Sequence, residues 1–303
     1  MTGKELEKFK KYFTKQGYVI HDFLEYEGKL PPEPFKKYFF PAKQKILKYD
    51  RGNYEEVLDE SKQVLLGVNV VDLKAIQFLD QVYAKDPYYQ ERVKNTILIG
   101  LSSGPKDKIK FKSFVMNFGA EVLEHIRFDL FLCRRKGNGF HVFTGSEDGQ
   151  RILDEFKYKD FEHINYRGPF HEGEIDKSAL DIREKLKNKY VKKIWDELGA
   201  KCIECGKCSY VCPCCYCFEI KDDANGDRFR EWSNCFQHEF SEVTGDHKFI
   251  NSTAERLFFY YYHKFVRDME KFNMPGCVGC GRCTRACPVG IDINKVIKQI
   301  LNS

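Results

Sequence analysis

Several features that define common protein classes are missing from this chain of 303 residues. No run approaches the roughly 20 apolar residues that cross a bilayer. The longest aromatic stretch, LFFYYYHKF at 257–265, is shorter than that and is flanked by Arg256 and Arg267. The opening MTGKELEKFKKYF carries charges where a secretion signal needs an apolar core. Neither G-x-G-x-x-G nor G-x-x-x-x-G-K-[ST] is present, so no nucleotide-binding loop is predicted. We expect a cytoplasmic chain without a membrane span.

Long blocks of one charge sign are also missing. The 50 Lys and Arg residues and the 45 Asp and Glu residues, which give a formal charge of +5, are mixed along the chain. Lysine-bearing stretches such as KKYF at 36–39 and KLKNKYVKK at 185–193 are therefore interpreted as solvated helix faces, not as a phosphate-binding stripe. We expect no nucleic-acid partner.

Cysteine is scarce in the first part of the chain and crowded in the second. Of the 13 cysteines, only Cys133 lies before residue 177, and it falls in an apolar strand where a buried, inert thiol is expected. We therefore divide the chain into domains 1–176 and 177–303. In a reducing compartment 13 thiols are not expected to form a disulfide framework, which leaves metal binding or thiol chemistry.

Domain 1–176 has the pattern of a mixed α/β domain. Four apolar runs in this domain indicate strands, of which the last two are 128–135 and 139–145. The stretch 72–84 is predicted to be a helix capped by Asp72. The two later runs flank KGNG, a turn sequence that favours a hairpin. The predicted strands are 63–71, 96–101, 128–135 and 139–145. Strands that alternate with helices predict an α/β layer structure, which would act as a scaffold or docking domain.

Domain 177–303 is predicted to be α-helical around its cysteines, so that the whole chain belongs to the α+β class. A helical period runs over 178–198, and Gly199 ends it. Another helix is expected to start at Asn251 or Ser252, and a final short helix is capped by Asp292.

Two cysteine runs in this domain share the spacing C-x2-C-x2-C-x3-C-P. This is the bacterial [4Fe–4S] ferredoxin pattern, in which the fourth cysteine of each run ligates the other cluster. Three cysteines two residues apart can surround one side of a cubane, and the remaining iron corner takes its thiolate from elsewhere. The predicted ligands are Cys202, Cys205, Cys208 and Cys287 for one cluster, and Cys277, Cys280, Cys283 and Cys212 for the other. Two clusters of charge 2− lower the net charge from +5 to about +1.

Other residues close to the runs leave alternatives open. Lys207, Arg282 and Arg285 either place positive charge beside the clusters, favouring the reduced state, or belong to solvated loops. The remaining cysteines could form a third iron–sulfur site or could be buried thiols packed around the clusters. They are Cys214, Cys215, Cys217 and Cys235. A pair of structural zinc sites fits less well, because such sites usually join two C-x2-C pairs about 12–20 residues apart.

Longer stretches resemble a known family. CIECGKCSYVCPCCYCFEIKDD, REWSNC, TGDHKFINSTAERLFFYYYHKF and CVGCGRCTRACPVGIDINKVI occur in the order found in the iron–sulfur electron-transfer subunits of anaerobic sulfite reductases and in the beta subunits of soluble sulfhydrogenase-type NiFe hydrogenases. The first domain is similar more loosely, through KYFFPAKQKILKY, LLGVNVVDLKAIQFLD and DPYYQERVKNTILIGLSS. The resemblance implies a ferredoxin-like second domain in a non-catalytic subunit, which relays electrons between a flavin- and NAD(P)H-binding subunit and a catalytic oxidoreductase subunit.

The first domain departs from this family at positions where relatives carry cysteine. Val71 stands where the family has the cysteine of Gly-Val-Arg-Pro-Cys-Asp, and Ser103 stands where it has the cysteine of Gly-Leu-Asn-Cys. A Cys-Phe-Cys that follows in relatives is also missing. The departures imply a domain without its own cluster that keeps a docking role, with the faces around Val71 and Ser103 as the candidates.

Two other classes of protein remain as alternatives. A zinc-stabilised interaction or nucleic-acid-binding protein would be colourless and would bind nucleic acid in a salt-dependent way. A free-standing ferredoxin-like carrier needs little beyond its clusters, and the large first domain argues against it.

Overall fold

The computed structural model describes residues 1–102, 120–135, 137, 139–169, 177–188, 190–245 and 247–303. Among these residues the chain forms two compact units. The first contains residues 1–31 and most of 58–169, and the second contains residues 32–57 and the cysteine-rich part from residue 177 onward. A segment from the first part of the sequence thus folds with the cysteine runs. The domain boundary at residue 176 stays a prediction.

The first unit is built on a six-stranded sheet with the strand order β1-β4-β5-β6-β7-β8. Its first four strands are parallel, β6 and β7 pair antiparallel, and β8 is parallel to β7. The strands are β1 (Val19–Asp22), β4 (Gln63–Val68), β5 (Thr96–Ser102), β6 (Leu130–Arg134), β7 (Phe140–Thr144) and β8 (Phe161–His163). The four strands predicted from apolar runs are confirmed, although residues 136 and 138 of the expected hairpin turn, and residue 103, lie outside the described residues.

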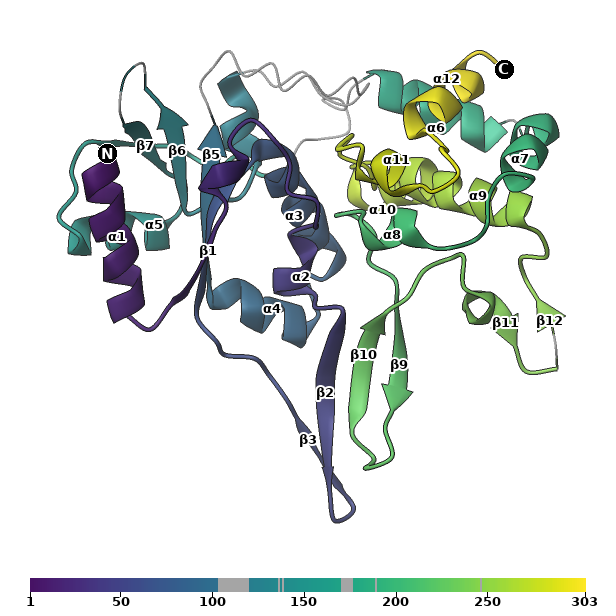
Figure 1. Ribbon diagram of the computed structural model, residues 1–303, viewed down its shortest axis with the longest axis horizontal. Coiled ribbons are helices and arrows are strands. Elements are labelled where there is room, and N and C mark those ends of the chain that lie inside the picture. The colour runs from purple at the N-terminus through teal and green to yellow at the C-terminus, as the bar shows by residue number, and fades with distance from the viewer. Residues whose placement is uncertain (103–119, 136, 138, 170–176, 189, 246) are drawn as a thin grey trace. The chain divides into compact units, whose positions relative to one another are not determined.

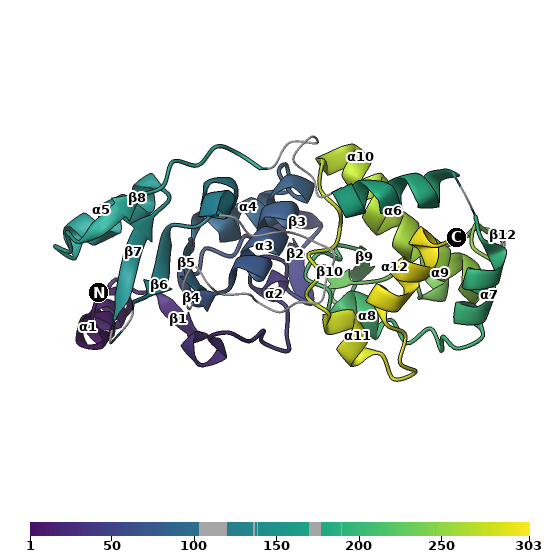
Figure 2. The same cartoon turned by 90° about the horizontal axis from the view of Figure 1, so that it is seen from above.

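Helices cover both faces of this sheet (Figure 2). On one face, α1 (Gly3–Lys15) and α5 (Glu147–Glu155) pack their apolar side chains against the strands, with Phe9 and Leu153 fully buried. On the other face lie α3 (Val70–Val82) and α4 (Pro87–Lys94). The helix α5 lies close to the main chain just before β6, because a Cβ added to Gly149 would lie 2.0 Å from the Asp129 carbonyl oxygen.

The start of α3 corrects one expectation. The side chain of Asn69 accepts a hydrogen bond from the Asp72 backbone N–H at 3.0 Å, so Asn69 is the N-cap and Asp72 lies inside the first turn. The helix therefore begins two residues earlier than predicted, and the strand before it ends at Val68. The apolar residues at 70 and 71 are compatible with the end of a strand or the start of a helix. The Asn69 cap places them in the helix.

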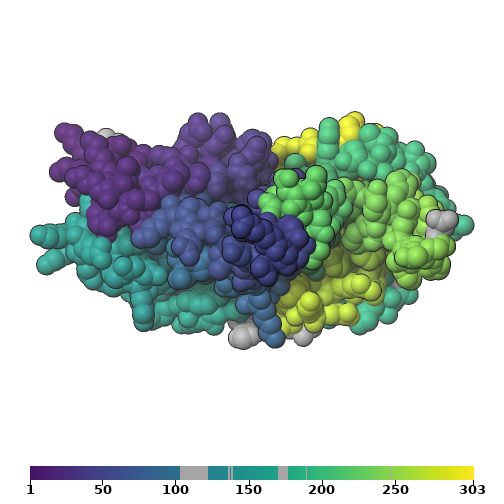
Figure 3. Space-filling view, turned by 90° about the horizontal axis from the view of Figure 1, so that it is seen from below, coloured from purple at the N-terminus to yellow at the C-terminus, as the bar shows by residue number. Residues whose placement is uncertain are grey.

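The second unit contains a four-stranded antiparallel sheet that the sequence did not predict. Its order is β3-β2-β10-β9, so the hairpin from the first part of the chain pairs with a hairpin between the cysteine runs. Figure 3 shows these two hairpins, dark blue and green, lying side by side. The strands are β2 (Lys43–Asp50), β3 (Asn53–Glu56), β9 (Phe218–Asp222) and β10 (Arg228–Trp232), and a separate short pair is formed by β11 (Glu242–Val243) and β12 (His247–Lys248).

Helices form the rest of the second unit (Figure 1). Their shared core includes Trp195, Phe265 and Ile297. The helices are α2 (Lys36–Phe39), α6 (Lys177–Asn188), α7 (Lys192–Gly199), α8 (Lys207–Tyr210), α9 (Thr253–Tyr262), the π-helical η5 (His263–Arg267), α10 (Asp268–Phe272), α11 (Arg282–Ala286) and α12 (Ile293–Leu301). Short 3-10 turns are η1 (Leu24–Tyr26) and η2 (Ala120–His125) in the first unit, and η4 (His238–Phe240) in the second.

Two expectations for these helices, a single helix over 178–198 and the two caps, have clear outcomes. The helix predicted over 178–198 is wrong as a single element, because α6 ends at Asn188 and α7 begins at Lys192. The expected caps Ser252 and Asp292 are confirmed, since each side chain accepts a backbone N–H of the first turn. Within the part of the chain that the structure describes, no helix has the length and apolar character needed to cross a membrane.

Candidate metal centre

The loops that carry the two cysteine runs have the same backbone course. In the first loop Glu204 and Gly206 have φ values of 52° and 66°, and in the second Gly279 and Gly281 both have 67°. The two left-handed positions stand at the same places in each run, the second one directly before a short helix, α8 or α11. Left-handed backbone of this kind favours glycine and turns the chain sharply. The repeated turns curl three cysteines of each run around one side of a cavity.

Space is tight at one of these turns. A Cβ added to Gly206 would lie 2.7 Å from Nδ2 of Asn234, a buried residue between β10 and η4. The main chain of the first loop is therefore packed directly against the segment that carries Cys235.

The first cavity brings together the four cysteines predicted for one cluster, one of them from the second run. It is lined by Cys202, Cys205, Cys208 and Cys287. Most of the remaining wall is apolar: Phe236, Leu257, Tyr260, Tyr261, Ile291 and Ile293. Burial raises the pKa of Cys208 to about 12. A thiolate is therefore disfavoured here unless positive charge, such as iron, accompanies it.

The second cavity brings together the other predicted set. It is lined by Cys212, Cys277, Cys280 and Cys283, of which Cys283 also borders the first cavity. Burial raises the pKa of Cys277 to about 12, whereas hydrogen bonds from the Cys214 and Cys215 thiols lower that of Cys212.

Backbone N–H groups point at sulfur in the second run. The Ile291 N–H donates to Cys287 Sγ at 3.3 Å, and the Gly279 N–H donates to Cys277 Sγ at 3.5 Å. Hydrogen bonds to cluster sulfurs stabilise negative charge and are one of the means by which proteins set a reduction potential.

A third cavity is lined by four of the five cysteines that lie outside the ferredoxin pattern, all except Cys133. These are Cys214, Cys215, Cys217 and Cys235. Tyr216, His263 and Asp268 also line it, and the Tyr216 hydroxyl donates to Asp268 Oδ1 at 2.9 Å. Over the described residues, no three Cys, His, Asp or Glu side chains converge on a point for a single metal ion, in this cavity or in the other two. Ligands of a cluster stand further apart, because each thiolate binds a different iron.

A buried lysine stands between the second and third cavities. Lys264 Nζ donates to Cys212 Sγ at 3.2 Å, to Cys215 Sγ at 3.3 Å and to the Gly276 carbonyl oxygen at 2.9 Å. Burial alone would lower its pKa, but the neighbouring cysteine thiolates raise it well above the usual value. The π-helical turn η5, a local widening of the kind that is frequent at functional sites, carries this residue.

A second buried lysine comes from the first part of the sequence. Lys36 Nζ donates to the carbonyl oxygens of Cys215 at 2.9 Å and Ser209 at 3.2 Å, and lies 4.2 Å from the centre of the Trp232 ring. Only 3% of the residue is exposed. The interpretation of KKYF as a solvated helix face is therefore wrong for Lys36, because α2 packs within the cysteine-rich unit. Burial lowers the pKa of this lysine.

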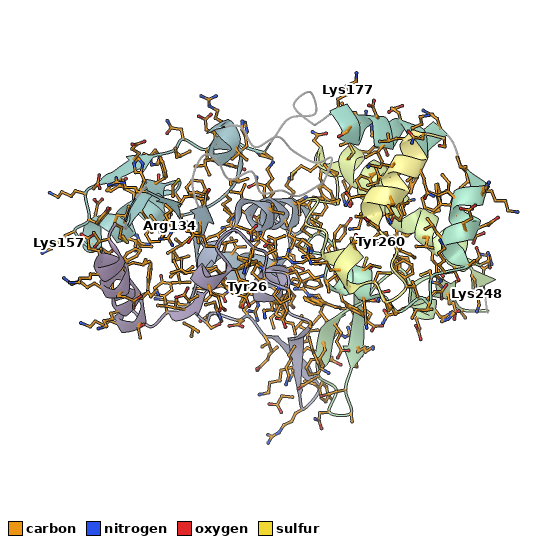
Figure 4. All side chains as sticks on the ribbon, turned by 45° about the horizontal axis from the view of Figure 1, so that its top comes forward. Tyr26, Arg134, Lys157, Lys177, Lys248 and Tyr260 are labelled. Atoms are coloured by element: carbon orange, nitrogen blue, oxygen red, sulfur yellow. The ribbon has the colours of Figure 1, made fainter. Side chains whose placement is uncertain are left out.

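Tyr260, labelled in Figure 4, belongs to α9 and lines all three cavities. Its hydroxyl is buried and has no hydrogen-bond partner among the described residues. A buried hydroxyl without a partner costs about 1–3 kcal/mol, so such groups are rare in folded proteins. The hydroxyl therefore marks a place where an acceptor belongs.

The three basic residues beside the cysteine runs differ in their burial and in their contacts. Arg282 is buried, Arg285 Nη1 donates to the Cys280 carbonyl oxygen at 3.3 Å, and Lys207 is exposed. A further arginine supports the segment around Cys235: Arg256, 3% exposed, donates to the Cys235 and Gln237 carbonyl oxygens at 2.9 and 2.8 Å.

These observations fit iron–sulfur clusters. The thiols are soft donors in sets of four, all 13 cysteines are free of disulfides, and buried positive charge and an unpartnered hydroxyl face the cavities. Cys133, on β6, is half-buried and far along the chain from both runs.

Comparison with known proteins places this part of the chain in a defined class. Residues 201–291 match the 4Fe-4S dicluster domain, so this is an iron–sulfur electron-transfer protein with two [4Fe–4S] clusters. The sulfhydrogenase 2 subunit beta of Pyrococcus furiosus is 33% identical over 293 residues, which cover 89% of this chain and 83% of that protein. The chain belongs to this hydrogenase beta-subunit family. No solved structure matches it.

Three candidate functional residues were not predicted from the sequence. Lys264 could have been noticed as a lysine inside the aromatic run LFFYYYHKF, where burial of its charge requires a partner. Nothing in the sequence around Lys36 links it to cysteines almost 180 residues away, as its 179-residue separation from Cys215 shows. Tyr260 is one of three consecutive tyrosines, and only the fold distinguishes it.

Proposed function

We propose that this chain relays electrons between a flavin- and NAD(P)H-binding reductase subunit and the catalytic subunit of a cytoplasmic hydrogenase-type complex. The observation that carries the proposal is the similarity to a sulfhydrogenase beta subunit over 89% of the chain, together with the dicluster domain. Thiols that form no disulfides fit a reducing compartment.

The proposed ligands are the two sets that line the first two cavities. One cluster takes Cys202, Cys205, Cys208 and Cys287, and the other takes Cys277, Cys280, Cys283 and Cys212. The clusters supply reversible one-electron transfer. The polypeptide fixes their positions through the left-handed turns and excludes water with the apolar wall that Phe236, Leu257 and Tyr261 contribute to the first cavity. Lys264 places positive charge beside the second set.

The chain has no proposed catalytic residue, and the first unit is proposed to dock partner subunits. Val71 itself is buried, and Ser103 lies outside the described residues, so the two faces suggested by the family departures stay predictions.

The relay is tested in the complex purified without oxygen from the native host. Hydrogen-dependent reduction of NAD(P)⁺ requires the whole path, whereas reduction of a viologen dye reports the catalytic subunit alone. We expect Cys205→Ser to reduce the first activity at least tenfold and to leave the second unchanged, and Cys133→Ser to alter neither. Wild-type rates of NAD(P)⁺ reduction in a Cys205→Ser complex that has lost iron would refute the relay. A complex that reduces sulfite and is inert toward hydrogen would refute the hydrogenase partner.

A further inference from the structure

The third cavity is built by chain segments that converge from different elements. Residues 214–217 follow the first run and lead into β9, while Cys235 follows β10. The register of the β9–β10 hairpin pairs Phe218 with Trp232, and the Ser233 N–H donates to the Cys217 carbonyl oxygen at 3.1 Å. The hairpin therefore holds Cys217 close to the segment of Cys235, and it accounts for how thiols 18 residues apart come to line one cavity.

Buried positive charge lies beside this cavity. Lys264 and Lys36 are both buried, and no more than 3% of either residue is exposed. Lys264 donates to the Cys215 sulfur, and the ammonium of Lys36 lies next to the carbonyl oxygen of the same residue. A negatively charged group in this cavity would be stabilised by Lys264, whose Nζ already contacts the Cys215 sulfur at 3.3 Å. A cluster with four thiolates supplies a charge of 2− for the common 2+ cubane core.

Polar side chains hold the wall in place. The Tyr216 hydroxyl donates to Asp268 Oδ1 at 2.9 Å and lies 3.2 Å from His263 Nε2, which fixes the residue between Cys215 and Cys217. The atom-free space of the cavity, part of which is open to solvent, is about 340 Å³, close to the 380 Å³ of the second cavity. Its donor set, size and charge thus match those of a site assigned to a [4Fe–4S] cluster.

We propose that Cys214, Cys215, Cys217 and Cys235 bind a third iron–sulfur cluster, beyond the two of the dicluster domain. Its occupancy does not depend on the proposed relay; only its use as an additional electron-transfer station rests on that function. Four cysteines are the usual ligand set for both [2Fe–2S] and [4Fe–4S] clusters, and the number of irons distinguishes them.

The test is a count of iron, acid-labile sulfide and zinc per chain in the full-length protein, purified without oxygen. We expect about ten or about twelve iron with matching sulfide in the wild type, against about eight for two cubanes alone. Cys217→Ala should lose the two or four extra irons and keep about eight. Cys133→Ala, which changes a thiol outside the three cavities, should lose none.

Each outcome decides the proposal. About eight iron in the wild type, or zinc in place of the extra iron, would overturn it. So would a Cys217→Ala protein that retains the wild-type iron and sulfide. The wild-type count needs no variant and stands even where the substitution prevents folding. Fewer than about eight iron with intact fold would count against the two-cluster relay instead, so the two failures are distinguishable.

Discussion

Replacing Tyr260 by phenylalanine removes one buried oxygen atom from the side chain that borders all three cysteine cavities. In the polypeptide alone this hydroxyl has no partner among the described residues. We expect it to donate to a cluster sulfur or cysteine thiolate in the loaded protein. That hydrogen bond strengthens when an electron is added, because the acceptor becomes more negative.

The magnitude follows from the strength of one such bond. A gain of about 1 kcal/mol on reduction corresponds to roughly 40 mV for a one-electron couple, since about 1.4 kcal/mol is a factor of ten and equals about 59 mV. Tyr260→Phe should therefore lower the reduction potential of at least one cluster by roughly 40 mV. Iron content should not change, because the ring that fills the space is retained.

The assay is an anaerobic redox titration followed by electron paramagnetic resonance. Tyr190→Phe is the matched control, because it makes the same chemical change on a residue that is 48% exposed and lines none of the three cavities. Potentials that agree with wild type within error, at full iron content, would refute the inferred hydrogen bond. In that case the hydroxyl stays unpartnered, and Tyr260→Phe should instead raise stability by about 1–3 kcal/mol.

Four further substitutions test other parts of the structure. Lys264→Met removes a buried positive charge 3.2 Å from a proposed ligand sulfur. It should lower a cluster potential by roughly 100 mV in the same titration, for an effective dielectric constant of about 20 and a charge separation of about 6 Å. Gly206→Ala introduces a Cβ at a left-handed, crowded position and should destabilise the loaded protein to denaturant by about 1–3 kcal/mol, whereas Gly290→Ala, with a similar φ but open space, should cost only about 1 kcal/mol. Arg256→Met leaves buried carbonyl oxygens without their donor and should lower the free energy of unfolding by about 2–4 kcal/mol; an unchanged denaturation midpoint would contradict this role. Gly149→Ala should destabilise the first unit by more than about 2 kcal/mol and leave iron per chain unaltered, so that iron loss there would show that the units depend on each other.

Local patterns account for what the sequence predicted well. The spacing of the cysteine runs depends on residues a few positions apart, and the apolar runs of β4 and β5 are fully or nearly fully buried strands that stand out from their polar surroundings. Helix caps are equally local, and both Ser252 and Asp292 were identifiable by residue type.

Long-range pairing accounts for what it did not predict. The strands β2 and β10 are rich in charged residues, and polar side chains pair across them. Lys43 forms an ion pair with Glu231 at 2.6 Å, and Arg230 donates a hydrogen bond to Gln44 at 2.8 Å. Neither strand has the alternation of apolar and polar residues from which a strand is predicted. The burial of Lys36 follows from the same pairing, because it brings residues 32–57 into the cysteine-rich unit. No pattern within a short window contains that information.

With the proposed ligands, the exchange of one cysteine between the two runs makes the chain loops nested. Cys202 and Cys287 enclose a loop of 85 residues (287 − 202), and Cys212 and Cys277 enclose one of 65 residues (277 − 212) that lies inside it. Closing a loop of this length costs about 4–5 kcal/mol of chain entropy. Once either cluster forms, however, the ligands of the other are linked to it by two tethers of only 4 residues (212 − 208 and 287 − 283). The second closure is then far less costly. With the proposed ligands, cluster loading is expected to be cooperative, with chains carrying either both clusters or neither.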